Sequence, residues 1–324
     1  MEASIEEWES LWIRIPHANL LQSWQYGAAK EQAEGWQVRR FLIAGANGQP
    51  VALAQWLTRT LPFLGGIARL NRGPVLLEAL PEVAAIEASL GVLQALLRAA
   101  RRQRWWIVQI APELPDHETS RQGLQRLGLR RQPITAWASG RLDLRTDEAS
   151  LLMGLKTKWR NCMRKGERNG VVVTHHQGNN SYQDLLIHNY ADLQQNRGFK
   201  GLSEELIRRL AEQQGRAWSL DLFVAKGSDT SIDDEPIGFL VSTHHGDTTT
   251  YLIGSTNDKG RQMQANSVLL WQAILHAKRS GCVWFDIGGL NAVTPKGIAN
   301  FKQGLNATPY ELAGEWRGYL FSPI

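Results

Sequence analysis

Cysteine is scarce in this chain, and hydrophobic segments of membrane-spanning length are missing. The only two cysteines among 324 residues, Cys162 and Cys282, have neither a disulfide framework nor a zinc-type spacing, which favours a reducing compartment. The N-terminal residues 1–7 are acidic and lack the apolar core of a signal peptide, and no later apolar run approaches about 18 residues. We therefore expect a cytoplasmic protein without a membrane span.

Patterns that indicate a nucleophilic side chain or a metal centre are also missing. No Ser/His/Asp or Cys/His arrangement stands out in the sequence. The adjacent pairs His175-His176 and His244-His245 lie near predicted strands, where neighbouring side chains point to opposite faces. Because no third ligand is evident beside them, we expect no metal site and no bound cofactor.

The chain does contain a duplicated order of elements. Residues 38–110 and 217–287 each predict a strand, a turn, a strand, a long helix and a final strand. A hydrophobic content of 43% is enough for about two ordinary domains. We predict an α+β fold of two similar units packed side by side with a cleft between them. A polar stretch at 145–150 predicts the boundary, giving domains 1–147 and 148–324.

Hydrophobic periodicity, capping residues and turn residues predict the individual elements. In the first half, helices are expected at 5–15, 23–30, 82–102 and 119–127, and strands at 37–44, 50–60, 67–72, 105–110 and 134–144. In the second half, helices are expected at 182–195, 203–214 and 264–279, and strands at 171–173, 218–226, 235–244, 248–255 and 283–287.

A basic helix precedes the second repeat. The formal charge of the chain is +5, and cations are concentrated at Lys156, Lys158, Arg160, Arg164 and Lys165. Leucine, tryptophan and methionine recur at helical spacing in the same region, which predicts an apolar stripe with a basic back. Such a helix is either a solvated cationic face or a binding surface for the phosphates of a nucleic acid or nucleotide.

Short motifs in a fixed order carry a resemblance to a known family. They are Ser23-Trp24 with Lys30 and Gly35-Trp36, Arg72-Gly73-Pro74-Val75, Lys158-x-Arg160-Asn161-x-x-Arg164-Lys165, Arg197-Gly198-Phe199, Tyr251-Leu252-Ile253-Gly254, Leu270-Trp271, Phe285-Asp286-Ile287-Gly288-Gly289 and Gly297-Ile298-x-x-Phe301-Lys302. Together, from about residue 23 to 314, they resemble the Fem-type aminoacyl-tRNA-dependent peptidyltransferases, which consist of two tandem acyltransferase units of the GNAT (acetyltransferase) fold.

The resemblance implies transfer of an aminoacyl group from a charged tRNA to an amine, forming a peptide bond outside the ribosome. The implied acceptor is a nucleotide-linked cell-wall precursor or a small peptide-like metabolite. Because the aminoacyl ester is already activated, this chemistry requires positioning and stabilisation of the tetrahedral oxyanion, and no nucleophilic side chain. The basic helix would then contact tRNA.

The resemblance also assigns roles to single residues. Lys302 matches a lysine at the transfer site, where a cation would stabilise the oxyanion or hold the terminal adenosine of the tRNA. Phe301 would stack on the adenine of that nucleotide. Lys30 and Arg197 match residues that bind the diphosphate of the acceptor, and Tyr251 matches a tyrosine that lines the acceptor site. Four of these residues also have an ordinary structural alternative: Phe301 as a core residue, Lys30 as a surface lysine, Arg197 as a helix-terminal charge and Tyr251 as a strand aromatic.

Asp286 ends a strand that should be central in its sheet, and two glycines follow it. A carboxylate at this position either orients the attacking amine and accepts its proton, or caps the turn through its own backbone. The pattern itself is compatible with both.

Two other functions compete with aminoacyl transfer. The first is an acyl-CoA-dependent N-acyltransferase, which usually has a glycine-rich turn at a helix start for the pyrophosphate. The corresponding residues 262–267 contain no glycine, which disfavours CoA. The second is a binding or immunity module without catalysis. The chain lacks the coiled-coil arm common in cell-wall members of the family, and the sequence predicts neither the transferred amino acid nor the oligomeric state.

Overall fold

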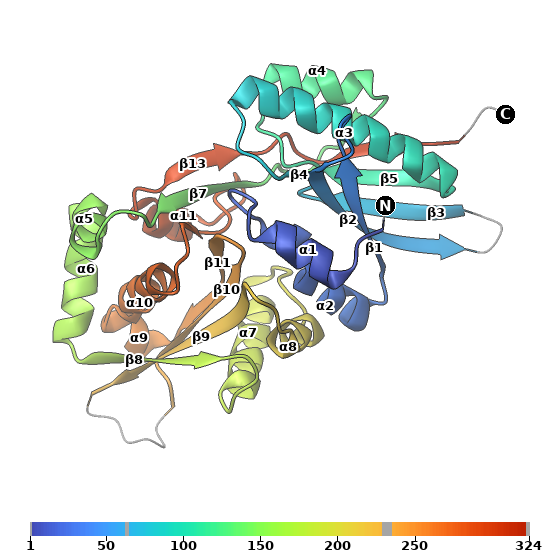
Figure 1. Ribbon diagram of the computed structural model, residues 1–324. Helices are drawn as coiled ribbons and strands as arrows, with labels where there is room; N and C mark the ends of the chain where they lie inside the picture. The colour runs from blue at the N-terminus through green and yellow to red at the C-terminus, as the bar shows by residue number, and fades with distance from the viewer. Residues whose placement is uncertain (1, 62–64, 229–234, 322–324) are drawn as a thin grey trace. The chain divides into compact units, whose positions relative to one another are not determined.

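The structure is a computed structural model, and it describes residues 2–61, 65–228 and 235–321 (Figure 1). The chain forms two compact units, each discontinuous in sequence. The first unit runs to Ser139 and also contains Asn291–Val293 and the segment from Pro309 onward. The second contains Gly140–Leu290 and Thr294–Thr308. The expected boundary between residues 147 and 148 stays a prediction, because each unit also takes segments from near the C-terminus.

The first unit is built on one mixed sheet with the strand order β1-β2-β3-β5-β14-β6, to which β4 adds beside β2. Its strands are β1 Gln37–Ala44, β2 Pro50–Leu61, β3 Gly65–Asn71, β4 Val75–Leu76, β5 Trp105–Ala111, β6 Arg130–Arg131 and β14 Trp316–Tyr319. Its helices are α1 Ile5–Trp12, the 3-10 helix η1 Leu20–Gln22, α2 Trp24–Glu34, α3 Glu82–Arg102 and α4 Glu118–Arg126.

Alternation along β2 sends side chains to two separate cores. Ala52 and Trp56 belong to a core with α3, whereas Leu53 packs with Trp8 and Trp12 of α1 on the opposite face. Figure 1 shows α3 and α4 along one face of this sheet and α1 and α2 along the other. The sheet of the first unit is therefore covered on both faces.

The helix α3 corrects one expectation. It is long and apolar enough, by length and composition, to cross a membrane, so the statement that no apolar run approaches about 18 residues is wrong for residues 82–102. One face of α3, with Ile86, Leu93 and Leu97, is buried against Val108 and the rest of the sheet core. A core helix passes the same length and composition test.

The second unit is built on a mixed sheet with the order β13-β7-β12-β11-β10-β9-β8. The strands of this sheet are β7 Ala138–Asp143, β8 Val171–Gln177, β9 Trp218–Gly227, β10 Gly238–His245, β11 Thr248–Thr256, β12 Trp284–Asp286 and β13 Thr308–Glu311. The first two residues of β7 and the last three of β13 fall in the segments assigned to the first unit. The helices are α5 Glu148–Gly154, α6 Thr157–Arg168, α7 Gln183–Arg197, α8 Glu204–Glu212, α9 Asp258–Gln262, α10 Ala265–Arg279 and α11 Lys296–Gln303.

The two sheets repeat one topology, as the duplicated pattern predicted. In the first, β1, β2 and β3 are antiparallel, and the long helix α3 leads to β5, which is parallel to β3. In the second, β9, β10 and β11 are antiparallel, and α10 leads to β12, parallel to β11. Two tandem units of this kind confirm the predicted α+β fold.

The strand beyond each parallel pair comes from a distant part of the chain. β14, close to the C-terminus, pairs antiparallel with β5 in the first sheet, and β7 pairs antiparallel with β12 in the second. The strand expected at 134–144 is therefore present as β7, but it belongs to the second sheet and not to the first. Pairing between segments so distant in sequence has no local signal.

Candidate active site

The candidate site lies where two parallel strands of the second unit separate. β11 and β12 pair over only three positions, from Thr248 opposite Trp284 to Thr250 opposite Asp286. Immediately after this pairing, β11 contains a bulge, because Val241 faces Ile253 and the next residue faces Tyr251. The chain beyond β12 turns at Gly288, whose φ is 70°. A β-carbon there would lie 2.9 Å from the Tyr251 carbonyl oxygen, so glycine allows this close approach.

Lys302 points into this turn from α11. Its side chain is only 6% exposed, and its Nζ donates a hydrogen bond of 3.2 Å to the carbonyl oxygen of Gly289. The same Nζ lies 4.8 Å from the centre of the Tyr251 ring, within the range of a cation–π contact. Burial lowers the pKa of Lys302 to about 8, against the opposing attraction of Asp286. The structure thus brings together three residues that the sequence analysis had selected separately.

Asp286 is 3% exposed and ends β12. One of its carboxylate oxygens accepts a 2.9 Å hydrogen bond from the backbone N–H of Gly288. This is the turn-capping arrangement that the sequence left open. The same carboxylate raises the pKa of Lys302 through its charge, so it is also electrostatically coupled to the ammonium. A role for Asp286 in orienting or deprotonating an amine stays a prediction.

Tyr251 is half-buried and packs against the core of the second unit. Burial raises the pKa of its hydroxyl to about 12, so the side chain is neutral across the physiological range. A β-carbon at Gly254 would lie within 2.0 Å of this hydroxyl oxygen. The glycine three residues along the same strand is therefore needed for the tyrosine to lie where it does.

Phe301 lies on α11, beside Lys302, and packs against the basic helix α6. Its ring is half-buried and lies 5.9 Å, centre to centre, from the ring of Trp159 on α6. The backbone N–H of Lys156 donates to the Gly304 carbonyl at 2.9 Å, so the start of α6 is attached to the end of α11. Core packing of Phe301 is the arrangement present in this structure. Its stacking on a base stays a prediction.

The basic residues of α6 divide into two groups. Lys156, Lys158, Arg164 and Lys165 are exposed, while Trp159 and Met163 are buried, as the apolar stripe predicted. Arg160 is instead folded back on the preceding segment and donates 2.8 Å to the Met153 carbonyl and 3.2 Å to the Thr157 hydroxyl. It therefore ties α5 to α6, and its guanidinium is engaged within the protein.

The two residues expected at the acceptor diphosphate lie in different units. Lys30 on α2 of the first unit forms an ion pair with Glu34, one turn along the helix. Arg197 is the last residue of α7 in the second unit and is exposed; Gly198 follows in the left-handed conformation and ends the helix. Their roles stay predictions.

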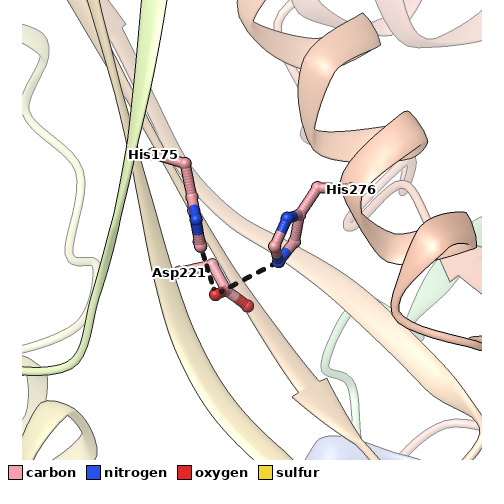
Figure 2. Close-up of side chains that lie close together, drawn as sticks. All are labelled: His175, Asp221 and His276. Carbon is pink, nitrogen blue, oxygen red and sulfur yellow. Dashed lines mark hydrogen bonds and ion pairs between the residues drawn. The ribbon is translucent and has the colours of Figure 1, made fainter.

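The sequence analysis missed one cluster. His175, Asp221 and His276 offer ligand atoms that all lie within 4.8 Å of one another (Figure 2). The reasoning against a metal considered only neighbours along the strand, and it found no third ligand for His175. A signal was available in Asp221, a lone carboxylate between Leu220 and Leu222 in strand β9. A charged residue at a buried strand position needs a partner of opposite charge or a metal.

Comparisons with known proteins agree with this architecture. Residues 154–303 match the family model described as an acetyltransferase (GNAT) domain. No match was found among the curated proteins. The crystal structure of FemX superposes with a TM-score of 0.78 at 16% identity, covering 98% of this chain and 96% of FemX.

Two further solved structures share the fold along nearly the full length of both chains at low identity. A tandem GNAT protein from the clavulanic acid biosynthesis pathway has a TM-score of 0.58 and 11% identity, covering 100% of this chain and 98% of that one. L-PGS from Bacillus licheniformis has a TM-score of 0.54 and 15% identity, with 100% and 94% covered. Residues 154–303 therefore match an acetyltransferase (GNAT) domain, and the chain has the tandem GNAT fold that FemX and the other two structures share.

Proposed function

We propose that this protein is an N-acyltransferase that moves an aminoacyl group from aminoacyl-tRNA to an amine. The observation that carries the proposal is the buried ammonium of Lys302, held between the Gly289 carbonyl and the ring of Tyr251. The Fem-type fold supports it, as does the similarity to FemX along nearly the full length of both chains. The amine belongs to a cell-wall precursor or to a small peptide-like metabolite. The cytoplasm, where charged tRNA is made, is the expected location.

The chemistry follows from the charge that develops during transfer. The amine attacks the ester carbonyl, the new C–N bond forms, and the carbonyl oxygen gains negative charge. An ammonium has three N–H donors, so Lys302 can donate to Gly289 and also to this oxyanion. The C–O bond to the terminal ribose then breaks, and the proton lost by the amine ends on the ribose oxygen. The charge of Asp286 favours the ammonium form of Lys302, and we assign this carboxylate to assist the proton transfer.

The exposed cations of α6 are the proposed contact for tRNA. Four lysine and arginine side chains of this segment face solvent, and the helix is attached to α11 through Trp159 and Phe301. Phosphates neutralised by such a face would direct the acylated end of the tRNA toward Lys302. The attachment of α6 to α11 supports one continuous donor surface within the second unit.

An acyl-CoA donor is the alternative, and the acetyltransferase (GNAT) match favours it equally. The structural argument against CoA comes from the turn before α10. The only glycine near it, Gly260, faces the backbone of Ile237 so closely that a β-carbon would lie 2.1 Å from that carbonyl oxygen. This glycine thus serves packing within the protein, and residues 262–267 offer no other.

The donor can be tested directly with purified protein. One panel of amines is offered with either charged tRNA or acetyl-CoA, and amide products are measured by mass spectrometry. The proposal predicts aminoacyl amides from charged tRNA and background levels from acetyl-CoA. Acetylated amines with no aminoacyl product would establish the alternative, and no product from either donor would favour a binding module.

A further inference from the structure

Two histidines and one aspartate meet on the second unit, on the face of the sheet that α10 covers. His175 comes from β8, Asp221 from β9 and His276 from the last turn of α10 (Figure 2). The distance from His175 Nε2 to Asp221 Oδ1 is 2.8 Å, and that from His276 Nε2 to the same oxygen is 3.6 Å. The two imidazole rings lie 4.0 Å apart, centre to centre. Both ring nitrogens thus face one carboxylate oxygen.

The three residues are far apart in sequence and meet only because β8, β9 and α10 pack together. In the pairing of β8 with β9, His175 lies opposite Phe223, so it shares a face with Asp221 two residues away. His276 reaches the same face because α10 packs across both strands. The separations of 46 and 55 residues from Asp221 explain why no motif spacing indicated the cluster.

The negative charge of Asp221 favours the binding of a cation in this cluster. Asp221 is 1% exposed, and its second carboxylate oxygen accepts a 2.6 Å hydrogen bond from Ser219. Burial opposes ionisation of this carboxyl, but hydrogen bonds with His175 and Ser219, together with the nearby His276 ring, outweigh burial and hold its pKa well below the ordinary value. The centre is therefore a buried carboxylate flanked by two imidazoles. The side chains of His175 and His276 are each about one-third exposed.

We propose that His175, Asp221 and His276 bind a divalent transition-metal ion of the zinc type. Two imidazole nitrogens and one carboxylate oxygen are ligands that zinc and cobalt accept and that magnesium and calcium do not prefer. Bonds of about 2.0–2.1 Å around a tetrahedral ion place ligand atoms roughly 3.3 Å apart. The nitrogen-to-oxygen distances of 2.8 and 3.6 Å lie on either side of this value. The partial exposure of both histidines leaves room for water as a further ligand.

This metal would act as a clamp on an edge of the sheet. β8 is the last strand in the order of the second sheet, and the ion would tie it to β9 and α10. Asp221 pairs with Ser242, which pairs with Tyr251, so two strand spacings, about 10 Å, separate the cluster from the candidate transfer site. The proposal therefore stands whether or not the protein uses charged tRNA.

Cobalt is the most direct probe. The full chain is stripped of metal with a chelator and titrated with Co²⁺, whose visible absorption reports coordination by protein ligands. The ligand variants are His175→Gln and His276→Gln, each tested alone. The matched control is His188→Gln, which changes a 76% exposed histidine on α7 that lies beside Asp192 in the same unit. Thermal melting with and without Zn²⁺ is recorded for all four proteins.

We expect one cobalt ion per chain, an absorption band that Zn²⁺ displaces, and release of protons as the metal enters. Each ligand variant should weaken binding at least tenfold, while the control binds as the unaltered protein does. Zinc at a hundredfold excess over its Kd should raise the melting temperature of the unaltered and control proteins by about 5 °C or more. Absence of stoichiometric binding, or equal binding by the ligand variants, would overturn the site and leave a metal-free hydrogen-bonded cluster.

Discussion

Burial of the Lys302 ammonium destabilises the folded protein, yet the proposed chemistry needs a buried positive charge at this position. Burial lowers its pKa from 10.5 to about 8, so at neutral pH the folded protein holds a charge that water would solvate better. Each unit of pKa shift corresponds to about 1.4 kcal/mol between the two protonation states. A site that stabilises an oxyanion needs this poorly solvated charge, because solvent would otherwise screen it.

The first prediction concerns the stability of Lys302→Met. Below pH 8 the ammonium is charged in both the folded and the unfolded chain, and its burial destabilises the folded protein by up to about 3 kcal/mol. Methionine of similar length should therefore stabilise the second unit at pH 7. The gain should shrink between pH 8 and 10.5, where the folded protein loses its proton first. Urea unfolding at several pH values measures it.

Lys296→Met is the control for this comparison, because it changes an exposed lysine on the same helix. It should alter stability little at any pH. A destabilised Lys302→Met protein at pH 7 would mean that the contacts of the ammonium with Gly289 and Tyr251 outweigh its burial.

The second prediction concerns the pH dependence of transfer. If the charged form of Lys302 stabilises the oxyanion, kcat should fall as pH rises through about 8, because the ammonium is lost there. An acceptor of low basicity is used, so that the amine is unprotonated throughout the range. A kcat that rises steadily from pH 7 to 9 with that acceptor would contradict the cationic role and would favour the neutral amine of Lys302 as a base.

At the scale of the elements, the proposal that the donor is a charged tRNA can be tested on the basic helix α6. In the proposed function, the exposed cations on α6 bind tRNA through counterion release, whereas Arg160 holds the joint with α5. Changing Lys158, Arg164 and Lys165 together to glutamine should therefore weaken tRNA binding and lower the slope of log Kd against log salt by about 2 to 3. Filter binding over a range of salt concentrations provides this slope.

A control of equal charge is available on the first unit. Arg98, Arg101 and Arg102 are exposed on α3, and their change to glutamine removes the same net charge. It should leave the slope nearly unchanged if binding is local to α6. An equal decrease of the slope in both triple variants would mean that the cations of α6 act only through the net charge of the protein.

The elements themselves followed closely from local patterns. β1 and α3 have the predicted bounds, and Ser23 caps α2 by accepting a hydrogen bond from the Tyr26 N–H. The short helix α11 and the four-residue strand β14 were not predicted as elements. Both are too short for a hydrophobic period to stand out. In α11, Lys302 is also buried where a polar side chain is expected to be exposed.

At the scale of the whole molecule, each sheet is completed by a strand from a distant part of the chain. β14 places Trp316, 1% exposed, in the core of the first unit beside β5. The repeat in the sequence predicted two similar units, but it could not predict that β7 and β14 complete the sheets as they do. The same limit applies to the cluster of His175, Asp221 and His276, since tertiary pairing alone brings its members together.

The fourth prediction tests this completion. Trp316→Ala removes a large buried side chain and should destabilise the first unit by about 3 to 5 kcal/mol. Hydrogen exchange should accelerate in β5 and β6, which flank β14, and stay slower in β9 and β10. Tyr319→Ala, at a half-exposed position of the same strand, is the control and should change exchange little. Faster exchange that begins in the second sheet would contradict the assignment of β14.

The most direct measurement of the central claim is single-turnover transfer from charged tRNA by three proteins: the unaltered chain, Lys302→Met and Lys296→Met. Amide formation and ester hydrolysis are followed in the same reaction, with tRNA binding measured beside them. The account predicts that Lys302→Met binds the tRNA and folds at least as stably as the unaltered chain, yet loses amide formation by at least a hundredfold, equivalent to about 2.7 kcal/mol of transition-state stabilisation. Lys296→Met should transfer normally. Amide formation by Lys302→Met at the unaltered rate would contradict the account.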